Sequence, residues 1–427
     1  MNILPPSDEQ PSNLNRDHAN ALAVQRILES KPFLVDIKQV GEILPELGKY
    51  DVLHAGPPLS GWDEATDVLK GSILGALVHT GLVTDVQAAE SLGRSGSLNF
   101  LSANDHQVAA TYAGVITRRT PVLVVENRVA GTVAMTALNE GRGKALRYGS
   151  NDAQTLERLG WIEGEFARIL GTAVRASGGI DLFAILKQAL HMGDEGHSRQ
   201  KAASALFAST IAPHLYGGGH SPEEVMLAMR TLVENEIFFL PLAMAACKAT
   251  MEAAKDVSNS TVVTCMCTNG VRFGIKISGA GEEWFTAPVP EVKGQYFKGF
   301  KLTDATSVIG DSEIIEAMGF GAFAMAAAPA LARYIGGTFE EATKMSEGMY
   351  AITTIEHPEF TLPALNFRGV PLGIDTELVV RHSIEPVFST GIAHRNAGVG
   401  QVGAGFGRVP LQCFAAGLKY VDEKTNT

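Results

Sequence analysis

The middle of the chain carries the feature that most narrows its fold. From Asp152 to Lys255, apolar residues recur with helical spacing in successive segments, and Gly or Pro separates most of them. The tetrad Ser221-Pro222-Glu223-Glu224 is a typical helix start. Because strand-like apolar runs lie on both sides of this block, we predict an α+β protein, with mixed α/β core halves and a helical domain inserted in the middle of the chain.

This pattern divides the chain into three predicted domains. We expect an N-terminal α/β domain over residues 1–150, a helical domain over residues 151–258 and a C-terminal α+β domain over residues 259–427. Hydrophobic residues make up 45% and charged residues 19% of the 427 positions, a composition typical of a well-packed globular protein.

Strands are predicted in both flanking halves. Pro121–Asn127 is a continuous β-branched run, as expected of a buried strand that leads into a site loop. Thr261–Thr268 and Val271–Ser278 are joined by Asn269-Gly270, which predicts a β-hairpin. Ile314–Tyr334 has a helical pattern interrupted by Gly and Pro, and Pro363–Val409 indicates strand and loop.

Composition also argues against several classes of partner. The formal net charge of −11 disfavours a general nucleic-acid binder or a polybasic membrane binder. The longest apolar run, Ala317–Ala332, is too short for a membrane span, and the N-terminus has no signal-peptide pattern. We therefore expect a cytoplasmic protein, with no nucleic-acid or membrane partner.

The richest cluster of reactive side chains is His191–Arg199, which follows a predicted amphipathic helix. Within it, Gly193 and Gly196 place the charged groups on a turn between helices. The candidate catalytic residues are Asp194, Glu195, His197 and Arg199. The alternative is a helix-capping cluster with no chemical role.

A metal site is a minor alternative for the same cluster. His191 and His197 are the candidate ligands, but a separation of six positions is a poor helical register for two ligands of one ion. We expect no certain cofactor, and a divalent metal only if the turn brings the two rings together.

A Gly-rich loop near the end of the chain is a candidate ligand contact. Gly398–Gly403 fits G-x-G-x-x-G, but too little chain follows it for a dinucleotide-binding unit. We interpret it as a loop whose backbone amides, at Gly400 and Gly403, approach a ligand, with His394 just before it. The alternative is an ordinary tight turn that contacts no ligand.

Other polar residues complete the predicted substrate site. Asn139–Lys144 with Arg147 is a basic, Gly-spaced cluster that suits an anion, or else a solvated helix start. His54 and Asn127 end predicted strands, where ligand crevices form in α/β sheets. The further candidates are His106, Arg272 and Asp311.

Many of these stretches, taken in chain order, resemble the YlbE/AllG-like family. The resemblance covers nearly the whole chain from Leu53 onward and rests on His54–Pro58, Pro121–Asn127, Leu138–Gly141, Leu146–Gly149, Met192–Glu195, Ala243–Lys248, Trp284–Pro288, Ile309–Ser312, Ala324–Ala330, Gly373–Asp375, Thr390–His394 and Gly398–Gly405. It implies an α+β fold with an inserted helical domain, in agreement with the pattern above.

The resemblance also implies a function. It points to a carbamoyltransferase component of allantoin degradation, a branch of purine catabolism, with a partner similar to succinyl-CoA synthetases. The implied reaction joins oxamate and carbamoyl phosphate to give oxalurate and phosphate, or runs in reverse, so the expected ligands are small anions and carbamoyl phosphate is a substrate. Such chemistry needs cations for the phosphate, for which Arg147, Arg199 and Arg272 are candidates.

The same chemistry assigns further roles and leaves alternatives open. Glu195 or His197 is the expected base, Asp194 orients it, and amides around Gly400–Gly405 hold an oxyanion. The alternatives are a hydrolase or ligase of another small amide or ureido acid, and a non-catalytic subunit of a multi-protein enzyme. Two packing partners are open for the apolar segment Ala317–Ala332: a second copy of the chain in a homodimer, or the core of the same chain.

Overall fold

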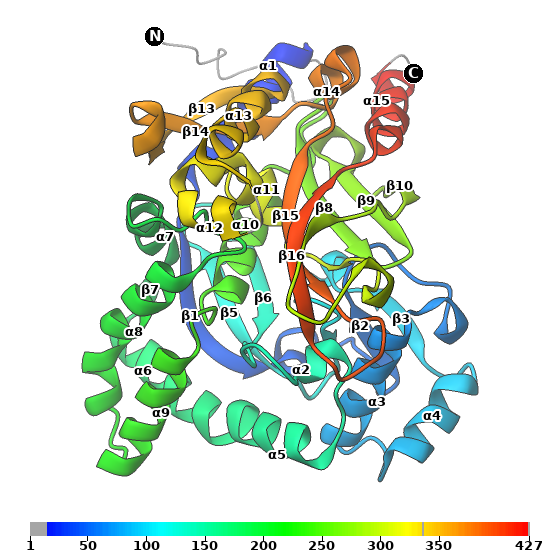
Figure 1. The fold of residues 1–427 in the computed structure, drawn as a ribbon, viewed down its shortest axis with the longest axis vertical. Helices are drawn as coiled ribbons and strands as arrows, with labels where there is room; N and C mark the ends of the chain where they lie inside the picture. Colours follow the sequence, from blue (N-terminus) through cyan, green and yellow to red (C-terminus); the bar gives the residue numbers. More distant parts are fainter. Residues whose placement is uncertain (1–14, 335–336, 426–427) are drawn as a thin grey trace.

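The computed structural model describes residues 15–334 and 337–425 as several small sheets surrounded by helices (Figure 1). The four-stranded sheet of the N-terminal half is antiparallel, in the order β6-β5-β1-β7. Its strands are β1 (Pro32–Gln39), β5 (Pro121–Asn127), β6 (Val133–Ala137) and β7 (Ile180–Asp181). The predicted strand β5 is therefore confirmed, but it ends in a hairpin turn with β6 instead of a site loop.

A smaller sheet and several helices complete this half. Strand β2 (Asp51–His54) pairs in parallel with β3 (Asn99–Ser102) and antiparallel with β4 (Val115–Ile116). The helices are α1 (Arg16–Glu29), the short α2 (Val40–Ile43), α3 (Asp67–His79) and α4 (Val86–Arg94). Thr66 and Asp85 cap α3 and α4 by accepting hydrogen bonds from backbone amides of the first helical turn.

The middle of the chain is helical, as predicted. Its helices are α5 (Ala153–Trp161), α6 (Ala167–Ser177), α7 (Leu182–His191), α8 (Lys201–Tyr216), α9 (Pro222–Glu234) and α10 (Leu240–Ala253), with a π-helical turn at Ile162–Phe166. Ser221 and Glu224 form a capping box at the start of α9. The segment also supplies β7 to the N-terminal sheet, so it shares that sheet with the first half of the chain.

The C-terminal half begins with the predicted hairpin. Strands β8 (Val263–Asn269) and β9 (Arg272–Ile277) pair antiparallel across Asn269-Gly270, and β10 (Phe285–Pro288) and β12 (Ile309–Gly310) flank them. A second sheet has the order β11-β16-β15 and consists of β11 (Lys293–Tyr296), β15 (Val387–Ala393) and β16 (Gln401–Arg408). Strands β15 and β16 run through the centre of the view in Figure 1.

The last elements close one end of the molecule. Strands β13 (Thr353–Leu362) and β14 (Arg368–Ile374) form a ribbon, accompanied by α13 (Phe339–Met349), α14 (Thr376–His382) and α15 (Leu411–Thr425). The strand-and-loop prediction for Pro363–Val409 was incomplete, because it missed α14. Both described ends of the chain lie at this end of the molecule (Figure 1).

The segment predicted as a helix over Ile314–Tyr334 is broken into three short helices. These are α11 (Ile314–Ala317), the 3-10 helix η8 (Gly321–Ala327) and α12 (Pro329–Tyr334). Gly319 and Gly321 have φ values of +84° and +62°, which an α-helix does not contain. Most of the apolar side chains of this segment are buried within the chain, so the intrachain core supplies their packing partner.

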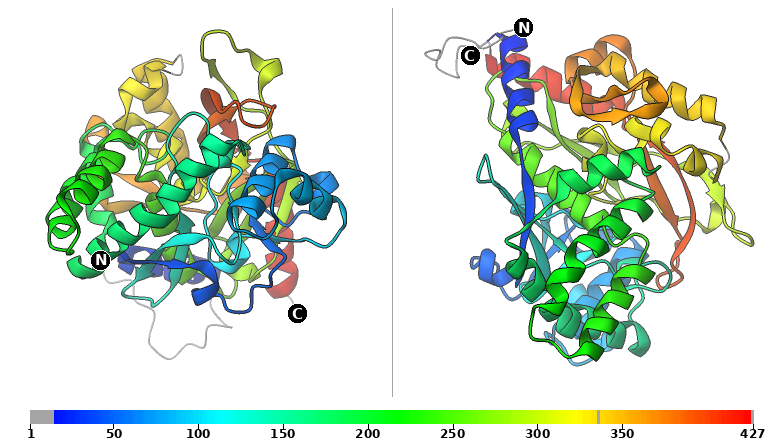
Figure 2. Two further views of the ribbon diagram at one scale, coloured as in Figure 1. Left: turned by 90° about the horizontal axis from the view of Figure 1, so that it is seen from below. Right: turned by 90° about the vertical axis from the view of Figure 1, so that its left-hand side faces the viewer.

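One hydrophobic cluster joins the three segments of the chain. It contains Ala23 of α1, Phe166 and Met244 of the helical segment, and Phe273 and Phe414 of the C-terminal half. The four Cys residues are free and buried. Over the described residues, no helix combines the length and apolar character that crossing a bilayer requires. The α+β fold class is confirmed, and the two views of Figure 2 show the helical segment packed against the strands.

Candidate functional site

A cavity of about 290 Å³ opens where the three segments of the chain meet. The N-terminal half contributes Thr111, Tyr112 and the loop that carries Arg142 and Arg147, while the helical segment contributes His197–Lys201 at the start of α8. The C-terminal half contributes polar and aromatic side chains, among them Phe297, Ser312, Thr390 and Gln401. The cluster between α7 and α8 therefore lies at a junction where side chains from distant parts of the sequence converge.

The two acids of the cluster organise its backbone. Asp194 is fully buried, and its Oδ2 accepts a hydrogen bond from the amide of Ala203 at 2.9 Å, in the first turn of α8. Glu195 is fully buried too, and accepts from the amides of Ser198 and Arg199. Asp194 therefore caps α8, and Glu195 closes the turn before it, as the helix-capping alternative predicts for these two residues.

The turn has this shape because glycines permit it. Gly193 and Gly196 have φ values of +94° and +91°. A Cβ atom at Gly196 would lie 3.2 Å from Cβ of Phe320, so the strained conformation combines with little room for a side chain. This turn brings His197 and Arg199 to the wall of the cavity.

His197 is held by a carboxylate from the C-terminal half. Its Nδ1 lies 2.8 Å from Oε1 of Glu316, and both side chains are almost completely buried. Burial alone would lower the pKa of His197, but the charge and hydrogen bond of Glu316 outweigh it and raise the pKa to about 9. The ring is therefore protonated at neutral pH and presents a positive charge to the cavity.

Further buried carboxyls surround this pair. Glu313 is fully buried, and within the described chain neither of its carboxyl oxygens has a hydrogen-bond partner. Burial raises the pKa of Glu313 to about 8, the pKa of Glu195 to about 7, and the pKa values of Asp194 and Asp311 to about 6. A protonated Glu313 is the form that such an environment favours at neutral pH.

The cations of the cavity differ in how they are paired. Arg199 Nε lies 3.3 Å from Asp194 Oδ1, without the alignment of a hydrogen bond, and Lys201 pairs with Glu236. Arg147 is only 6% exposed, and none of the described carboxylates forms an ion pair with it. Arg142 is exposed at the rim. The cavity wall is thus rich in positive charge in a chain that is negatively charged overall.

The structure places the three histidines predicted to bind substrate, His54, His106 and His394, outside the cavity. His54 is fully buried, with Nδ1 2.8 Å from the carbonyl oxygen of Ala55, and burial lowers its pKa to about 4. Nδ1 of His106 lies 3.0 Å from the carbonyl oxygen of Ser102. His394 Nδ1 accepts from the amide of Asn396 at 2.9 Å. These rings stabilise local turns.

The predicted asparagines also have structural partners. Asn127 lies at the β5–β6 turn, where its Oδ1 accepts from the amide of Val129 at 3.2 Å and, outside the turn, from the amide of Lys31 at 3.0 Å. It therefore shapes the hairpin turn, and the strand that it ends is antiparallel to its neighbours. Asn139 donates to the carbonyl oxygen of Ile237 at 2.5 Å and accepts from the amide of Gly141. It therefore positions the loop that carries Arg142 and Arg147, although it does not line the cavity itself.

Arg272 and Asp311 likewise hold the fold together. Arg272 pairs with Glu64 and donates to the carbonyl oxygen of Pro58 at 3.0 Å. Asp311 accepts from the amides of Gly56 and Ala110, at 2.7 and 2.8 Å, so it joins the two halves instead of capping the helix that follows it.

The Gly-rich loop differs from its prediction as well. Gly403 and Gly405 lie within β16, between β11 and β15, where the ladder uses their backbone groups. The carbonyl oxygen of Gly400 accepts from the amide of His394 at 3.0 Å. Of the stretch from Gly398 to Gly405, Gln401 and Ala404 line the cavity. An oxyanion site of free amides is therefore not formed by these strand residues.

The two candidate metal ligands have different partners. His191 Nε2 lies 3.0 Å from Oγ1 of Thr361, whereas His197 binds Glu316. The described residues contain no group of three or more His, Cys, Asp or Glu side chains placed to hold an ion.

Sequence reasoning missed several residues that line the cavity. Tyr112 and Ser312 lie far apart in the sequence, so no local pattern joins them, whereas Gln200 and Lys201 directly follow the predicted cluster that ends at Arg199. Glu316 was missed because it lies in an apolar run, which predicts a buried core segment and not a site. Arg142 and Gln401 did carry a local signal, since Arg142 belongs to the predicted basic cluster and Gln401 to the predicted Gly-rich stretch.

These features define an α+β protein with a cation-rich pocket at the junction of its three segments. The family model described as oxamate carbamoyltransferase subunit AllG matches residues 98–312. Subunit AllG of Escherichia coli K12 itself is 38% identical over 408 residues, which are 95% of this chain and 97% of that protein. The chain therefore belongs to the AllG family.

Two further relatives have no established function. YahG of Escherichia coli K12, an uncharacterized protein, is 41% identical over 396 residues, 93% of this chain and 84% of that protein. A crystal structure of a conserved protein of unknown function from Enterococcus faecalis V583 superposes with a TM-score of 0.94 at 39% identity, covering 96% of this chain and 98% of the other.

Proposed function

We propose that this chain acts as an AllG-type component of oxamate carbamoyltransferase and binds a small anionic substrate in the central cavity. The observation that carries the proposal is the environment of Arg147. This guanidinium is 6% exposed, stacks over the ring of Tyr148 at 4.3 Å and donates to the carbonyl oxygen of Gly141 at 2.8 Å. It has no carboxylate partner among the described residues, and its Nε has no acceptor there.

A buried charge without a counterion is costly, by several kcal/mol in effective terms. A ligand carboxylate or phosphate would supply the missing countercharge, and Arg199 and protonated His197 face the same cavity. Planar guanidinium groups bind both kinds of anion through paired hydrogen bonds. Oxamate, oxalurate, carbamoyl phosphate and phosphate all carry such a group.

The proposed reaction fits these groups. The amide nitrogen of oxamate forms a bond to the carbamoyl carbon, the bond from that carbon to the phosphate oxygen breaks, and the proton that the nitrogen loses passes to the departing phosphate, which leaves as hydrogen phosphate. Cations stabilise the negative charge on the departing phosphate. His197, protonated at neutral pH, is suited to donate a hydrogen bond to an oxygen, so its proposed role is electrophilic.

The acids then have supporting roles. Because Asp194 and Glu195 bind backbone amides, we assign them to positioning Arg199 and His197 instead of to proton abstraction. The partner remains part of the proposal: a succinyl-CoA-synthetase-like protein completes the enzyme, and this chain supplies the anion pocket. A hydrolase or ligase of another small amide or ureido acid is the second candidate, and it would use the same anion contacts.

Calorimetric titration of the purified chain tests the proposal. We expect oxamate, oxalurate, carbamoyl phosphate or phosphate to bind, and Arg147→Gln to weaken that binding by at least about tenfold, since a charge-assisted contact is lost. Arg230→Gln is the matched control, because Arg230 pairs with Glu234 on the exposed face of α9. Unchanged affinity in Arg147→Gln, or no binding of any of the four anions, would contradict the proposal.

A further inference from the structure

Gln200 lies at the cavity and has an unusual environment. It is the residue immediately before α8, is 1% exposed and lines the cavity together with Arg199 and Lys201. Its Oε1 is buried and has no hydrogen-bond donor among the described residues. A buried acceptor of this kind normally has a partner in the native state.

The orientation of the amide is fixed by the turn. Nε2 of Gln200 donates to the carbonyl oxygen of Gly196, which can only accept. The side chain therefore cannot be reversed without placing two acceptors against each other. Oε1 must be the atom that lacks a partner.

Helix capping does not use this oxygen. A residue at the position before a helix commonly accepts a hydrogen bond from an amide of the first helical turn, but here the amide of Ala203 donates to Asp194 instead. The Gln200 side chain makes no cap bond of its own. Its carbonyl oxygen is thus left for a donor from outside the turn.

We infer that Gln200 Oε1 accepts a hydrogen bond from the N–H of a primary amide or carbamoyl group on the anion in the cavity. The inference rests on the proposed function, and it adds a specificity determinant to it. Arg147 and Arg199 hold the anionic end of the ligand, while Gln200 recognises the neutral NH₂ group beside it. The ligand class is a small anion that carries an NH₂ group on a carbonyl carbon.

Isosteric pairs of anions test this recognition. Pyruvate has the shape and single charge of oxamate with a methyl group in place of the amino group, and acetyl phosphate stands in the same relation to carbamoyl phosphate. A methyl group occupies the space but donates no hydrogen bond, so Gln200 stays unsatisfied. Both members of a pair carry the same anionic group, so the proposed contacts to that group are the same for both.

The experiment measures dissociation constants of oxamate and pyruvate, and of the two acyl phosphates, for the wild-type chain and for Gln200→Met. We expect the wild type to prefer the amide member of each pair by on the order of tenfold. In Gln200→Met, the dissociation constants of the two members of a pair should become nearly equal, because only the binding of the amide member is weakened. Unchanged pyruvate and acetyl phosphate affinity shows that the cavity remains intact in the variant.

The outcomes separate the two proposals. The role of Gln200 is overturned, and the anion site is retained, if the wild type binds both members of a pair with similar dissociation constants. The same holds if Gln200→Met still prefers the amide member. Equal weakening of both members of a pair in the variant also overturns it, because it indicates a structural role. Absence of anion binding in the wild type overturns the proposed function and this inference together.

Discussion

At the scale of single residues, neighbouring side chains in the cluster between α7 and α8 have different roles. Asp194 and Glu195 bind backbone amides, whereas Arg199 and His197 face the cavity. The sequence identified the cluster but could not separate these roles, because adjacent polar residues look alike until their partners are known. The partners of Asp194 lie up to nine positions away, and Glu316 lies 119 positions from His197.

Asp194 and Arg199 should therefore respond differently to substitution. Asp194→Ala removes the cap of α8 and leaves the buried amide of Ala203 without its acceptor, so we expect a loss of about 2 kcal/mol in unfolding free energy. Arg199→Gln should leave the melting temperature within a few degrees and weaken anion binding. Thermal denaturation and calorimetric titration of both variants check this. Equal destabilisation by the two changes would contradict the separation of roles.

The buried carboxyl of Glu313 gives a pH-dependent prediction. Burial raises its folded-state pKa from 4.5 to about 8, with His197, Glu316 and Asp311 as its charged neighbours. Between these pH values the unfolded chain has lost the proton and the folded chain retains it, so this group lowers the stability of the wild type as pH rises. Glu313→Gln should therefore become progressively more stable than the wild type from pH 5 to pH 8.

Melting temperatures at pH 5, 6.5 and 8 measure this effect. Glu223→Gln, which changes an exposed carboxylate on α9, is the matched control and should show no such trend. A constant difference between Glu313→Gln and the wild type at all three pH values would show that Glu313 is not protonated in the folded chain.

At the scale of elements, local signals predicted the helical middle segment and the strands β5, β8 and β9. Strand β5 matches its prediction residue for residue, and the Asn269-Gly270 turn joins β8 and β9 as expected. The segment from Ile314 to Tyr334 was harder, because its composition favours a helix while its glycines break it. There the burial of nearly every side chain, rather than local propensity, determines the path of the chain.

The β8–β9 turn offers a test at this scale. Gly270 has a φ of +87°, and a Cβ atom there would lie 2.8 Å from Cγ1 of Ile309. Gly270→Ala should lower the unfolding free energy by about 1 to 3 kcal/mol through backbone strain and overpacking. Gly96→Ala is the control, since Gly96 has a φ of +75° with open space around it. Denaturant unfolding should show the larger loss for Gly270→Ala.

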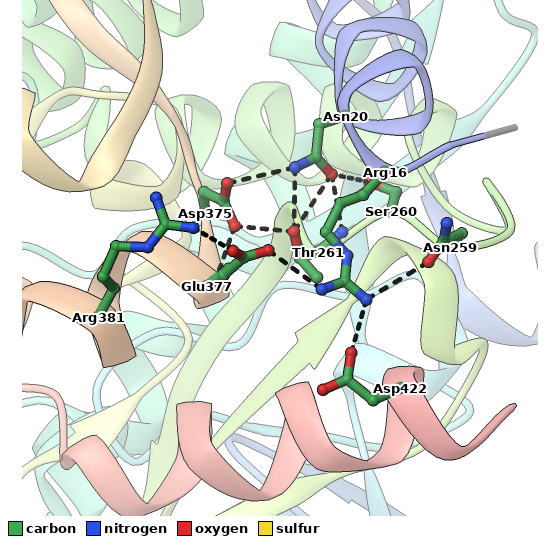
Figure 3. Close-up of polar contacts among 9 residues, drawn as sticks. All are labelled: Arg16, Asn20, Asn259, Ser260, Thr261, Asp375, Glu377, Arg381 and Asp422. Carbon is green, nitrogen blue, oxygen red and sulfur yellow. Dashed lines mark hydrogen bonds and ion pairs between the residues drawn. The ribbon is translucent and has the colours of Figure 1, made fainter. Parts of the chain in front are cut away.

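At the scale of the whole molecule, a polar network joins segments far apart in the sequence (Figure 3). Arg16 at the start of α1 pairs with Glu377 of α14 and Asp422 of α15, at 3.0 and 2.6 Å. Deeper in the same network, Asn20 contacts Thr261 and Asp375 at 3.0 and 3.3 Å, with all three buried. The network fixes α1 against the C-terminal half.

Asn20→Ala should destabilise the whole chain. It leaves buried groups of Thr261 and Asp375 without Asn20 as a partner, so we expect a loss of about 2 kcal/mol or more in unfolding free energy. Arg381→Gln, at the exposed edge of the same network, should cost about 1 kcal/mol or less. Urea unfolding midpoints compare them, and similar losses for the two variants would refute a central role for Asn20.

The sequence by itself determined the α+β class, the helical block, the strands β5, β8 and β9, and the turn that carries His197 and Arg199. These depend on periodicity and on glycine and capping residues, which act over a few positions. Only the tertiary structure decided which polar residues share the cavity and which hold the fold. Arg147, Arg199, Gln200, Ser312 and Gln401 meet there because three segments pack on one core, and such contacts follow from packing between distant elements, which local sequence does not encode.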